Sequence, residues 1–242
     1  MMPPYIDFEQ EELAETSLKI GAIKLNISSP FEWASGYRMP IYNDNRMLLF
    51  DCESRDLVDT LLIDEVRRKY GNQDITIAGT STAGIPWATS LANFRRGNLI
   101  YVRDKPKTHG LRNRIEGLDA SRGLDGRRVV LIEDLISTGG SSVSAVQAIR
   151  DAGGKIDYCF SIFNYGFNMA KKMFRGEFPF DDKGSILLEP CNNVSIMDYK
   201  TLMAVAEKNG YIKKEELAEL EDWRKDPLNW GEKRGFPRVE KA

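Results

Sequence analysis

Short apolar runs alternate with stretches of helical periodicity through the middle of the chain. Each run has the length and composition of a strand buried in a parallel sheet. The runs are residues 75–78, 99–102, 128–132 and 158–163. Between them apolar residues recur at helical spacing, as at Val143, Val146 and Ile149 before the stop at Gly153. Strands alternating with helices predict βαβ units, so we expect an α/β fold with a mostly parallel central sheet flanked by helices.

The hydrophobic pattern is weaker at the two ends of the chain than in its middle. We expect one domain over 1–242, although the length also allows two small domains. Its predicted parts are a turn-rich region at about 20–50, an α/β core at 54–165 and C-terminal helices with an irregular tail at 166–242. Apolar spacing predicts a first helix from Phe8 to Ile20, a helix at 169–174, a short strand at 185–188, and helices at 197–209 and 213–223.

Composition narrows the functional class. The net charge of −2 argues against a bulk affinity for nucleic acid, and the chain has no apolar run of the ~20 residues that a membrane span needs. The three cysteines, Cys52, Cys159 and Cys191, are far apart and form no metal-spaced pair. The first residues lack the pattern of a signal or transit peptide. We therefore expect a cytoplasmic protein with reduced thiols.

The most informative segment is residues 129–141. A buried strand precedes two acids, Glu133 and Asp134, and a hydroxyl-rich and glycine-rich turn then opens a helix. Free N–H groups at such a turn, with the helix dipole behind them, suit a phosphate. Carboxylates suit sugar hydroxyls or a divalent cation. A phosphorylated sugar would use both halves, whereas the alternative is an ordinary strand–turn–helix connection.

The geometry of a β-strand limits whether Glu133 and Asp134 can contact the same sugar. Adjacent side chains on a regular strand point to opposite faces. Glu133 and Asp134 can therefore reach one sugar only if the strand has already turned there.

Two further segments follow predicted strands, and ligands of α/β sheets gather at that edge. Residues 79–84 are small and hydroxylated, and they suit either a second phosphate group or a tight turn. Residues 103–117 are cationic, contain the only histidine, His109, and indicate a lid over an anion. The alternatives for this lid are a solvated loop or a nucleic-acid patch, but it lacks the interleaved aromatic residues that stack on bases.

These segments resemble a known family. Residues 129–141 resemble the phosphoribosyl-pyrophosphate signature of type I phosphoribosyltransferases, and no Gly-Lys-Ser/Thr closes a nucleotide P-loop. Residues 101–110 are similar to the catalytic loop of orotate phosphoribosyltransferases. Residues 31–36, with 40–42 and 44–46, look like the small N-terminal hood subdomain that covers the base in that family, and 79–86 look like its pyrophosphate loop.

The resemblance implies roles for individual residues. Arg103, Lys107 and His109 would neutralise pyrophosphate and, with Asp134, form the catalytic set; Glu133 and Asp134 would hold the ribose hydroxyls. Ser137 would also lie near orotate. The remaining substrate-binding candidates are Leu135, Ile136, Thr138, Gly139, Gly140 and Ser141 around the 5′-phosphate, Thr80, Ser81, Thr82, Ala83 and Gly84 around pyrophosphate, and Tyr42 and Arg46 in the hood.

Three departures from the family pattern qualify these roles. Ala34 and Asp104 stand where many members have basic residues, so both pyrophosphate contacts are dropped. The arginine that grips the orotate carboxylate in some members is replaced by Asn164-Tyr165-Gly166-Phe167. Arg46 is the candidate for that role because bidentate arginine geometry suits a carboxylate, and a surface turn residue is the alternative.

The expected activity follows from the resemblance. It is transfer of a phosphoribosyl group from phosphoribosyl pyrophosphate to N1 of orotate, giving orotidine 5′-monophosphate and pyrophosphate in pyrimidine biosynthesis. Mg²⁺ would be the cofactor, held mainly by substrate and water and not by metal-ligating residues. A homodimer is implied, with the 103–117 loop crossing to the other subunit. The alternatives are transfer to another base, or a non-catalytic regulator that senses phosphoribosyl pyrophosphate.

Overall fold

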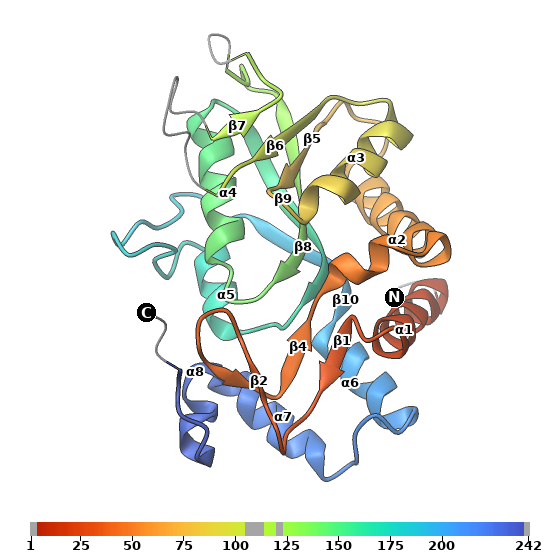
Figure 1. The fold of residues 1–242 in the computed structure, drawn as a ribbon. Coiled ribbons are helices and arrows are strands. Elements are labelled where there is room, and N and C mark those ends of the chain that lie inside the picture. Colours follow the sequence, from red (N-terminus) through yellow and green to blue (C-terminus); the bar gives the residue numbers. More distant parts are fainter. Residues whose placement is uncertain (1–3, 105–113, 120–122, 240–242) are drawn as a thin grey trace. The chain divides into compact units, whose positions relative to one another are not determined.

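The computed structural model describes residues 4–104, 114–119 and 123–239, with side chains from residue 8 onward (Figure 1). It divides into two compact units. One comprises Asp56–Ile196, and the other combines Met1–Arg55 with Met197–Ala242. The expectation of a single domain over 1–242 stays a prediction.

The first unit is built on a six-stranded sheet in the order β10-β9-β8-β5-β6-β7. Neighbours β9-β8, β8-β5 and β5-β6 are parallel, and the short β7 is antiparallel to its neighbour β6. This confirms the predicted mostly parallel sheet. The strands are β5 (Thr76–Thr80), β6 (Leu99–Val102), β7 (Ile115–Glu116), β8 (Arg128–Ile136), β9 (Lys155–Asn164) and β10 (Asn192–Asp198).

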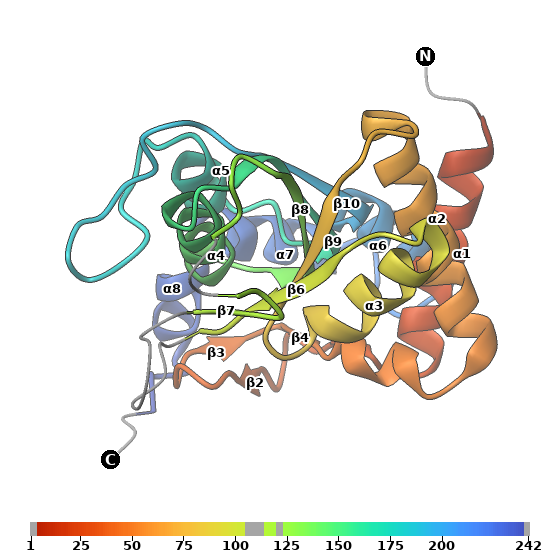
Figure 2. The same ribbon diagram turned by 90° about the horizontal axis from the view of Figure 1, so that it is seen from above.

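Helices cover both faces of this sheet, as a strand buried on both sides requires. In Figures 1 and 2, α4 and α5 lie on one side and α2 and α3 on the other. Their bounds are α2 (Cys52–Tyr70), α3 (Gly84–Arg95), α4 (Gly140–Asp151) and α5 (Asn168–Phe174). The α4 face has the predicted spacing, with Val143, Val146 and Ile149 all fully buried.

One strand predicted in this unit is absent, and one strand of the structure was not predicted. The strand expected at 185–188 is irregular: Leu187 is buried in the core, but Leu188 is 88% exposed, so the segment buries a single side chain and not the face of a strand. The real strand is β10, which buries Ile196 and Met197. It ends where Asp198 caps the next helix by accepting a hydrogen bond from the Thr201 N–H (2.8 Å).

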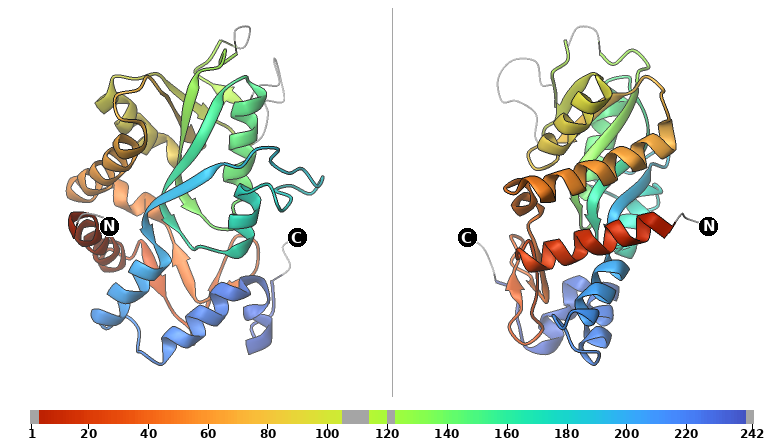
Figure 3. Two further views of the ribbon diagram at one scale, coloured as in Figure 1. Left: turned by 180° about the vertical axis from the view of Figure 1, so that it is seen from behind. Right: turned by 90° about the vertical axis from the view of Figure 1, so that its right-hand side faces the viewer.

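The second unit contains the N-terminal helix, four very short strands and the C-terminal helices. α1 packs on α6 (Figure 3). Two antiparallel pairs, β1-β4 and β2-β3, occupy the region predicted to be irregular. Its elements are α1 (Pro4–Lys19), β1 (Ile23–Leu25), β2 (Phe31–Glu32), β3 (Arg38–Met39), β4 (Ile41–Asn43), η1 (Asn45–Leu49), α6 (Tyr199–Lys208), α7 (Glu216–Lys225), α8 (Pro227–Trp230) and η2 (Glu232–Arg234).

The tail after residue 223 is more ordered than the sequence indicated. It contains α8 and η2, and Trp223 and Trp230 are both buried within this unit. No helix among the described residues is long and apolar enough to cross a membrane.

The burial of the centre of β8 leads to a prediction about the free energy of unfolding. Replacing the fully buried Leu131 by alanine should lower the free energy of unfolding by about 2–5 kcal/mol, because it removes core contacts and leaves a cavity. Urea denaturation followed by circular dichroism measures the change. The matched control is Leu188→Ala at a site that is 88% exposed, which should stay within about 0.5 kcal/mol. Equal losses in the two variants would contradict the assignment of β8 to the core.

Candidate active site

A cavity of about 440 Å³ lies at the carboxyl ends of β5, β6 and β8. All three segments that the sequence placed at this edge contribute to it. Its lining residues are Thr80, Ser81, Thr82, Ala83, Val102, Arg103, Asp104, Arg114, Glu133, Asp134, Leu135, Ser141 and Ala145. The α/β rule that ligands bind beyond the strand ends therefore places this cavity first among candidate sites.

The register of the sheet explains how the two acids border one cavity. The last pair between β5 and β8 joins Gly79 to Ile132, while β8 continues to pair with β9 as far as Ile136. The strand has not turned at the acids, so the expectation that it ends before Glu133 was wrong. Because β8 extends beyond β5, its edge is open from Glu133 onward, and both acids lie along that open edge.

The two carboxyl groups lie at different depths. Glu133 is 6% exposed, whereas Asp134 is half-buried. Glu133 Oε1 accepts a hydrogen bond from Thr80 Oγ1 (2.6 Å), and its Oε2 accepts one from Ser142 Oγ (3.1 Å). Thr80 ends β5 and Ser142 lies in the first turn of α4. Glu133 thus links the end of β5 and the start of α4 to β8 through hydrogen bonds.

Burial sets the protonation of Glu133. Desolvation is the main cause that raises the pKa of this carboxyl group, and the neighbouring Asp134 raises it further through its charge and a hydrogen bond. The hydrogen bond from Thr80 acts in the opposite direction but is weaker. These causes together favour the neutral form of the Glu133 carboxyl group near neutral pH.

Two helices begin at this cavity. The turn Ser137–Gly139 leads into α4, and the turn Ser81–Ala83 leads into α3. Helix N-termini present unsatisfied N–H groups and a partial positive charge, so each turn is suited to a phosphate. Of the residues predicted for the 5′-phosphate and for pyrophosphate, the cavity lining contains Thr80, Ser81, Thr82, Ala83, Leu135 and Ser141, and it does not contain Gly84, Ile136, Ser137, Thr138, Gly139 or Gly140. The side chain of Ile136 is fully buried in the core. The substrate contacts of all these residues stay predictions.

Glycines are required in both turns. Gly139 has φ 94°, a left-handed conformation that favours glycine, and its added Cβ would lie 3.1 Å from Ala170 Cα. An added Cβ on Gly84 would lie 2.3 Å from the Ile132 carbonyl oxygen and 2.5 Å from Thr80 Oγ1. Any larger residue would push α3 away from β8 and alter the cavity.

The cationic segment is described only at its two ends. Arg103 and Glu116 form an ion pair (3.3 Å) across the antiparallel β6-β7 ladder. Lys107 and His109 lie outside the described residues, so their predicted contacts with pyrophosphate stay predictions.

Arg114 is a cavity residue that the sequence reasoning did not single out. Its Nε donates to the Arg103 carbonyl oxygen (2.9 Å), and its Nη1 donates to Ser144 Oγ (2.8 Å) in α4. Partial burial lowers the pKa of its guanidinium, which still stays charged at neutral pH. In the sequence, Arg114 was one of several cations of the loop. The one signal that could have separated it from the others is that it directly precedes Ile115 and Glu116, which form β7.

Tyr42 and Arg46 lie in the other unit. Tyr42 is half-buried with its ring 5.9 Å from that of Phe31. Arg46 forms a bidentate ion pair with Asp44, from Nε to Oδ1 (2.6 Å) and from Nη2 to Oδ2 (2.9 Å). This hydrogen bonding is the main cause that lowers the pKa of Asp44. Arg46 therefore has an internal carboxylate partner, and its role toward orotate stays a prediction.

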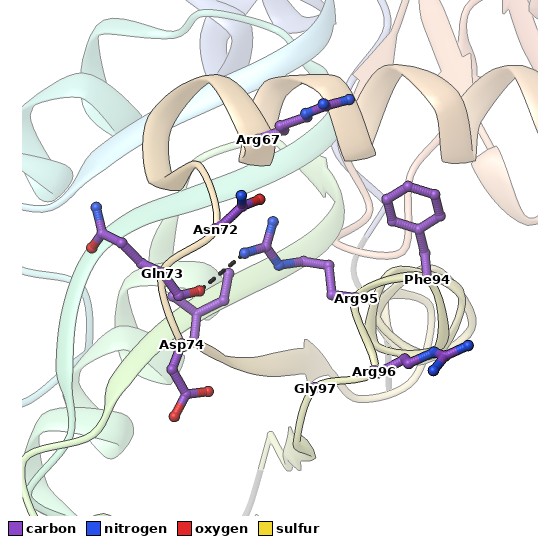
Figure 4. Close-up of a pocket in the computed structure, with 9 residues that line it drawn as sticks. Arg67, Asn72, Gln73, Asp74, Phe94, Arg95, Arg96 and Gly97 are labelled. Atoms are coloured by element: carbon purple, nitrogen blue, oxygen red, sulfur yellow. Dashed lines mark hydrogen bonds between the residues drawn. The ribbon is translucent and has the colours of Figure 1, made fainter.

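A second and larger cavity, of about 540 Å³, lies at the opposite end of β5 (Figure 4). There Arg95 donates from Nη2 to the carbonyl oxygens of Gly71 and Gln73, both at 3.0 Å, beyond the end of α2. The helices α2 and α3 both end here, so their basic last turns compensate helix dipoles. The cavity is lined by no acid pair and no helix N-terminus, and we assign the active site to the first cavity.

The described residues contain no group of three or more histidine, cysteine, aspartate or glutamate side chains placed to hold a metal ion. Carboxylate oxygen near the phosphate turns comes from Asp134, which is half-buried.

Comparisons with known proteins agree with this geometry. The phosphoribosyl transferase domain family matches residues 53–173. An orotate phosphoribosyltransferase of Cytophaga hutchinsonii is 41% identical over 91% of this chain and 97% of its own length, and one of Bacteroides thetaiotaomicron is 40% identical over 90% and 94%. The crystal structure of the Aeropyrum pernix orotate phosphoribosyltransferase superposes with a TM-score of 0.63 at 27% identity, covering 83% of this chain and 99% of that one.

The sheet order, the two phosphate-suited turns and these relatives lead to one assignment. The chain has the type I phosphoribosyltransferase fold and belongs to the orotate phosphoribosyltransferase family.

Proposed function

We propose that this enzyme transfers the phosphoribosyl group of phosphoribosyl pyrophosphate to N1 of orotate, giving orotidine 5′-monophosphate and pyrophosphate in pyrimidine biosynthesis. The observation that carries the proposal is the first cavity, where two helix-opening turns flank an acid pair at one sheet edge. A substrate with a phosphate at one end, a diphosphate at the other and ribose hydroxyls between them matches that order of groups.

The two turns would bind the two ends of the substrate. The turn before α4 would hold the 5′-phosphate through main-chain N–H groups and the hydroxyls of Ser137, Thr138 and Ser141. The turn before α3 would hold pyrophosphate through Ser81 and Thr82. Fixing both ends would place the anomeric carbon between them. The loss of translational and rotational entropy would then occur when the substrate binds, which lowers the barrier of the chemical step.

The two acids would have different roles. Glu133 is occupied by Thr80 and Ser142, and it positions both turns. Asp134 is half-buried and lines the cavity, so its carboxylate is the one suited to accept hydrogen bonds from ribose hydroxyls. An ionised carboxylate at this place would also stabilise positive charge that develops at the ribose C1 in the transition state.

Cations around the leaving group complete the mechanism. Bond cleavage places negative charge on pyrophosphate, so donors at that end stabilise the transition state more than the ground state. Arg103 and Arg114 border the cavity. Lys107 and His109 are the additional cations that the resemblance implies, and a loop carrying them would also exclude water from the activated sugar.

Mg²⁺ is the proposed cofactor, and the donor set suits it. A hard cation prefers oxygen ligands and retains water, and Asp134 offers carboxylate oxygen beside the phosphate turns. Bound mainly by substrate oxygens and water, the ion would neutralise diphosphate charge.

We also propose a homodimer in the cytoplasm, with the loop between Arg103 and Gly117 crossing to the other subunit. This rests on the family resemblance, and sedimentation velocity would measure the assembly state.

The activity is tested by following orotate ultraviolet absorbance with purified protein, phosphoribosyl pyrophosphate and Mg²⁺. Loss of absorbance that needs all components and is inhibited by added pyrophosphate is the expected result. Turnover with uracil or a purine instead would keep the phosphate sites and overturn the base assignment. Tight binding of phosphoribosyl pyrophosphate without turnover of any base would favour a sensor.

The positioning role of Glu133 predicts a difference between two substitutions. Glu133→Ala leaves the Thr80 and Ser142 hydroxyls without their partner, which should cost about 1–3 kcal/mol of stability and lower kcat/KM for phosphoribosyl pyrophosphate more than about tenfold. Glu133→Gln keeps a neutral acceptor of the same size, so it should retain stability within about 1 kcal/mol. Thermal unfolding and steady-state kinetics measure both. An inactive but stable Glu133→Gln enzyme would show that the ionised carboxylate itself is needed.

The loop lysine gives an independent prediction. Lys107→Ala should lower kcat more than about tenfold because a cation that meets the leaving pyrophosphate is lost. The melting temperature should not change. The matched control is Lys183→Ala, since Lys183 is an exposed lysine at another loop of the same unit. Unchanged turnover of Lys107→Ala would remove this lysine from the mechanism.

A further inference from the structure

The side chain of Arg114 bridges two elements that border the first cavity. Its Nε donates to the carbonyl oxygen of Arg103, the residue that follows β6 (2.9 Å). Its Nη1 donates both to Ser144 Oγ (2.8 Å) and to the Ser144 carbonyl oxygen (3.1 Å) in α4. One guanidinium group therefore links the end of β6 to the helix that begins after the turn 137–139.

The main chain holds Arg114 in the place that this bridge needs. The Arg103 N–H donates to the Arg114 carbonyl oxygen (2.8 Å), and the β6-β7 ladder pairs Val102 with Ile115. Arg103 also forms its ion pair with Glu116 (3.3 Å). Because these contacts fix Arg114 opposite the end of β6, its side chain reaches α4 from a defined position.

Each end of the bridge lies next to one of the two turns. The Ser81 N–H donates to the Val102 carbonyl oxygen (2.9 Å), so the turn before α3 is attached to β6 one residue before Arg103. At the other end, Ser144 lies in the helix that the second turn opens. The contacts of Arg114 thus connect the strand beside one turn to the helix that follows the other.

Glu133 and Arg114 attach the same helix to different strands. Ser142 of α4 donates to Glu133 in β8 (3.1 Å), and Ser144 accepts from Arg114 on the β6 side. The apolar side chains of α4 hold it against the sheet, but packed helices can slide by small amounts past their neighbours. Two polar contacts to two strands oppose such sliding in a way that a single contact does not.

An arginine is suited to this bridge. Its planar guanidinium carries several donors in a fixed fork, so it can donate to two elements at once, whereas a lysine has one nitrogen on a flexible stem. Arg114 is half-buried, and desolvation is the main cause that lowers the pKa of its guanidinium. The group stays charged, so its hydrogen bonds are charge-assisted and stronger than neutral ones.

A ligand with an anionic group at each end depends on the spacing between the turns. It can occupy both turns only if their separation matches its own length, and an error of about 1 Å at a site can cost about a hundredfold in rate. A ligand with an anionic group at one end occupies a single turn, so its affinity does not depend on that separation.

We propose that Arg114 is a positioning residue, which sets the spacing between the turn before α3 and the turn before α4 and so favours ligands that carry an anionic group at each end. The inference rests on the proposed function, which assigns a diphosphate to one turn and a 5′-phosphate to the other. It adds a structural role for Arg114, which the proposed mechanism uses as a nearby cation.

The test measures equilibrium binding of three ligands by isothermal titration calorimetry, with Mg²⁺ and without a base. Phosphoribosyl pyrophosphate spans both turns, whereas inorganic pyrophosphate and ribose 5-phosphate each occupy one. Arg114→Ala should raise the Kd for phosphoribosyl pyrophosphate about tenfold, the effect of losing about one charged hydrogen bond. The Kd values for pyrophosphate and ribose 5-phosphate should rise by less than about twofold, because neither ligand needs the set spacing.

Two further variants separate position from charge. Arg114→Lys keeps the positive charge but cannot donate to both elements at once, so its Kd for phosphoribosyl pyrophosphate should rise almost as far as in Arg114→Ala. Ser144→Ala removes one acceptor and leaves Arg114 in place, so it tests the bridge even if Arg114→Ala does not fold. It should raise that Kd about twofold to threefold in the intact enzyme and no further in an Arg114→Ala background.

The matched control is Arg95→Ala. Arg95 is a half-buried arginine of the same unit, and it donates to the carbonyl oxygens of Gly71 and Gln73 at the opposite end of β5. Its loss removes comparable hydrogen bonds at a place away from the two turns, so all three Kd values should equal those of the intact enzyme.

An equal rise in the Kd values for phosphoribosyl pyrophosphate and for pyrophosphate would overturn the positioning role, because it indicates direct contact between Arg114 and the anion. An unchanged Kd for phosphoribosyl pyrophosphate in both Arg114→Ala and Arg114→Lys would overturn it too, while leaving the proposed function intact. An intact protein that binds no phosphoribosyl pyrophosphate would overturn the proposed function, and the positioning role with it.

Discussion

The buried carboxyl group of Glu133 joins the three elements that form the cavity. It accepts hydrogen bonds from Thr80 at the end of β5 and from Ser142 at the start of α4. Its own strand, β8, continues past the two acids to Ile136. Without this group, two buried hydroxyls would lose a partner and the two phosphate-suited turns would be joined only through the sheet and through Arg114. The spacing between the turns, which a substrate with two phosphate ends requires, depends on this interaction.

The same interaction explains why two adjacent acids can differ in chemistry. Removing a carboxylate from water is unfavourable, so burial raises the pKa of Glu133 and favours its neutral form, whereas Asp134 is more exposed. A neutral acid can donate a hydrogen bond as well as accept hydrogen bonds, and both oxygens of the Glu133 carboxyl group accept from hydroxyls. The pair therefore provides one buried, hydrogen-bonded group and one half-buried group from two chemically similar side chains.

The second unit depends on long-range packing of another kind. Its strands are two or three residues long and could not be stable alone. Buried indoles of Trp223 and Trp230, which come from the far end of the chain, supply the apolar surface on which these short strands rest. The loop 33–37 is consequently shaped by residues about two hundred positions away in sequence, since the Val239 N–H donates to the Gly36 carbonyl oxygen (2.9 Å).

The sequence determined the main strands, their alternation with helices and the two turns, because these features are local, whereas the order of the strands in the sheet came from the tertiary structure. An apolar run buried on both faces and a glycine-rich turn before a helical pattern each arise from neighbouring residues, and Gly139 shows the agreement. It did not reveal β10 in place of residues 185–188, because only tertiary packing decides which of two short apolar segments finds a neighbouring strand.

The tertiary structure alone also decided the roles of individual polar groups. Both Glu133 and Asp134 border the cavity because β8 extends past β5, and that register is absent from local sequence. Arg114 became a cavity residue through contacts with α4, and the tail became part of the loop 33–37 through contacts across the chain. Burial and hydrogen-bond partners are properties of the assembled fold, so the sequence could name the candidate groups but could not assign their depth, charge or partners.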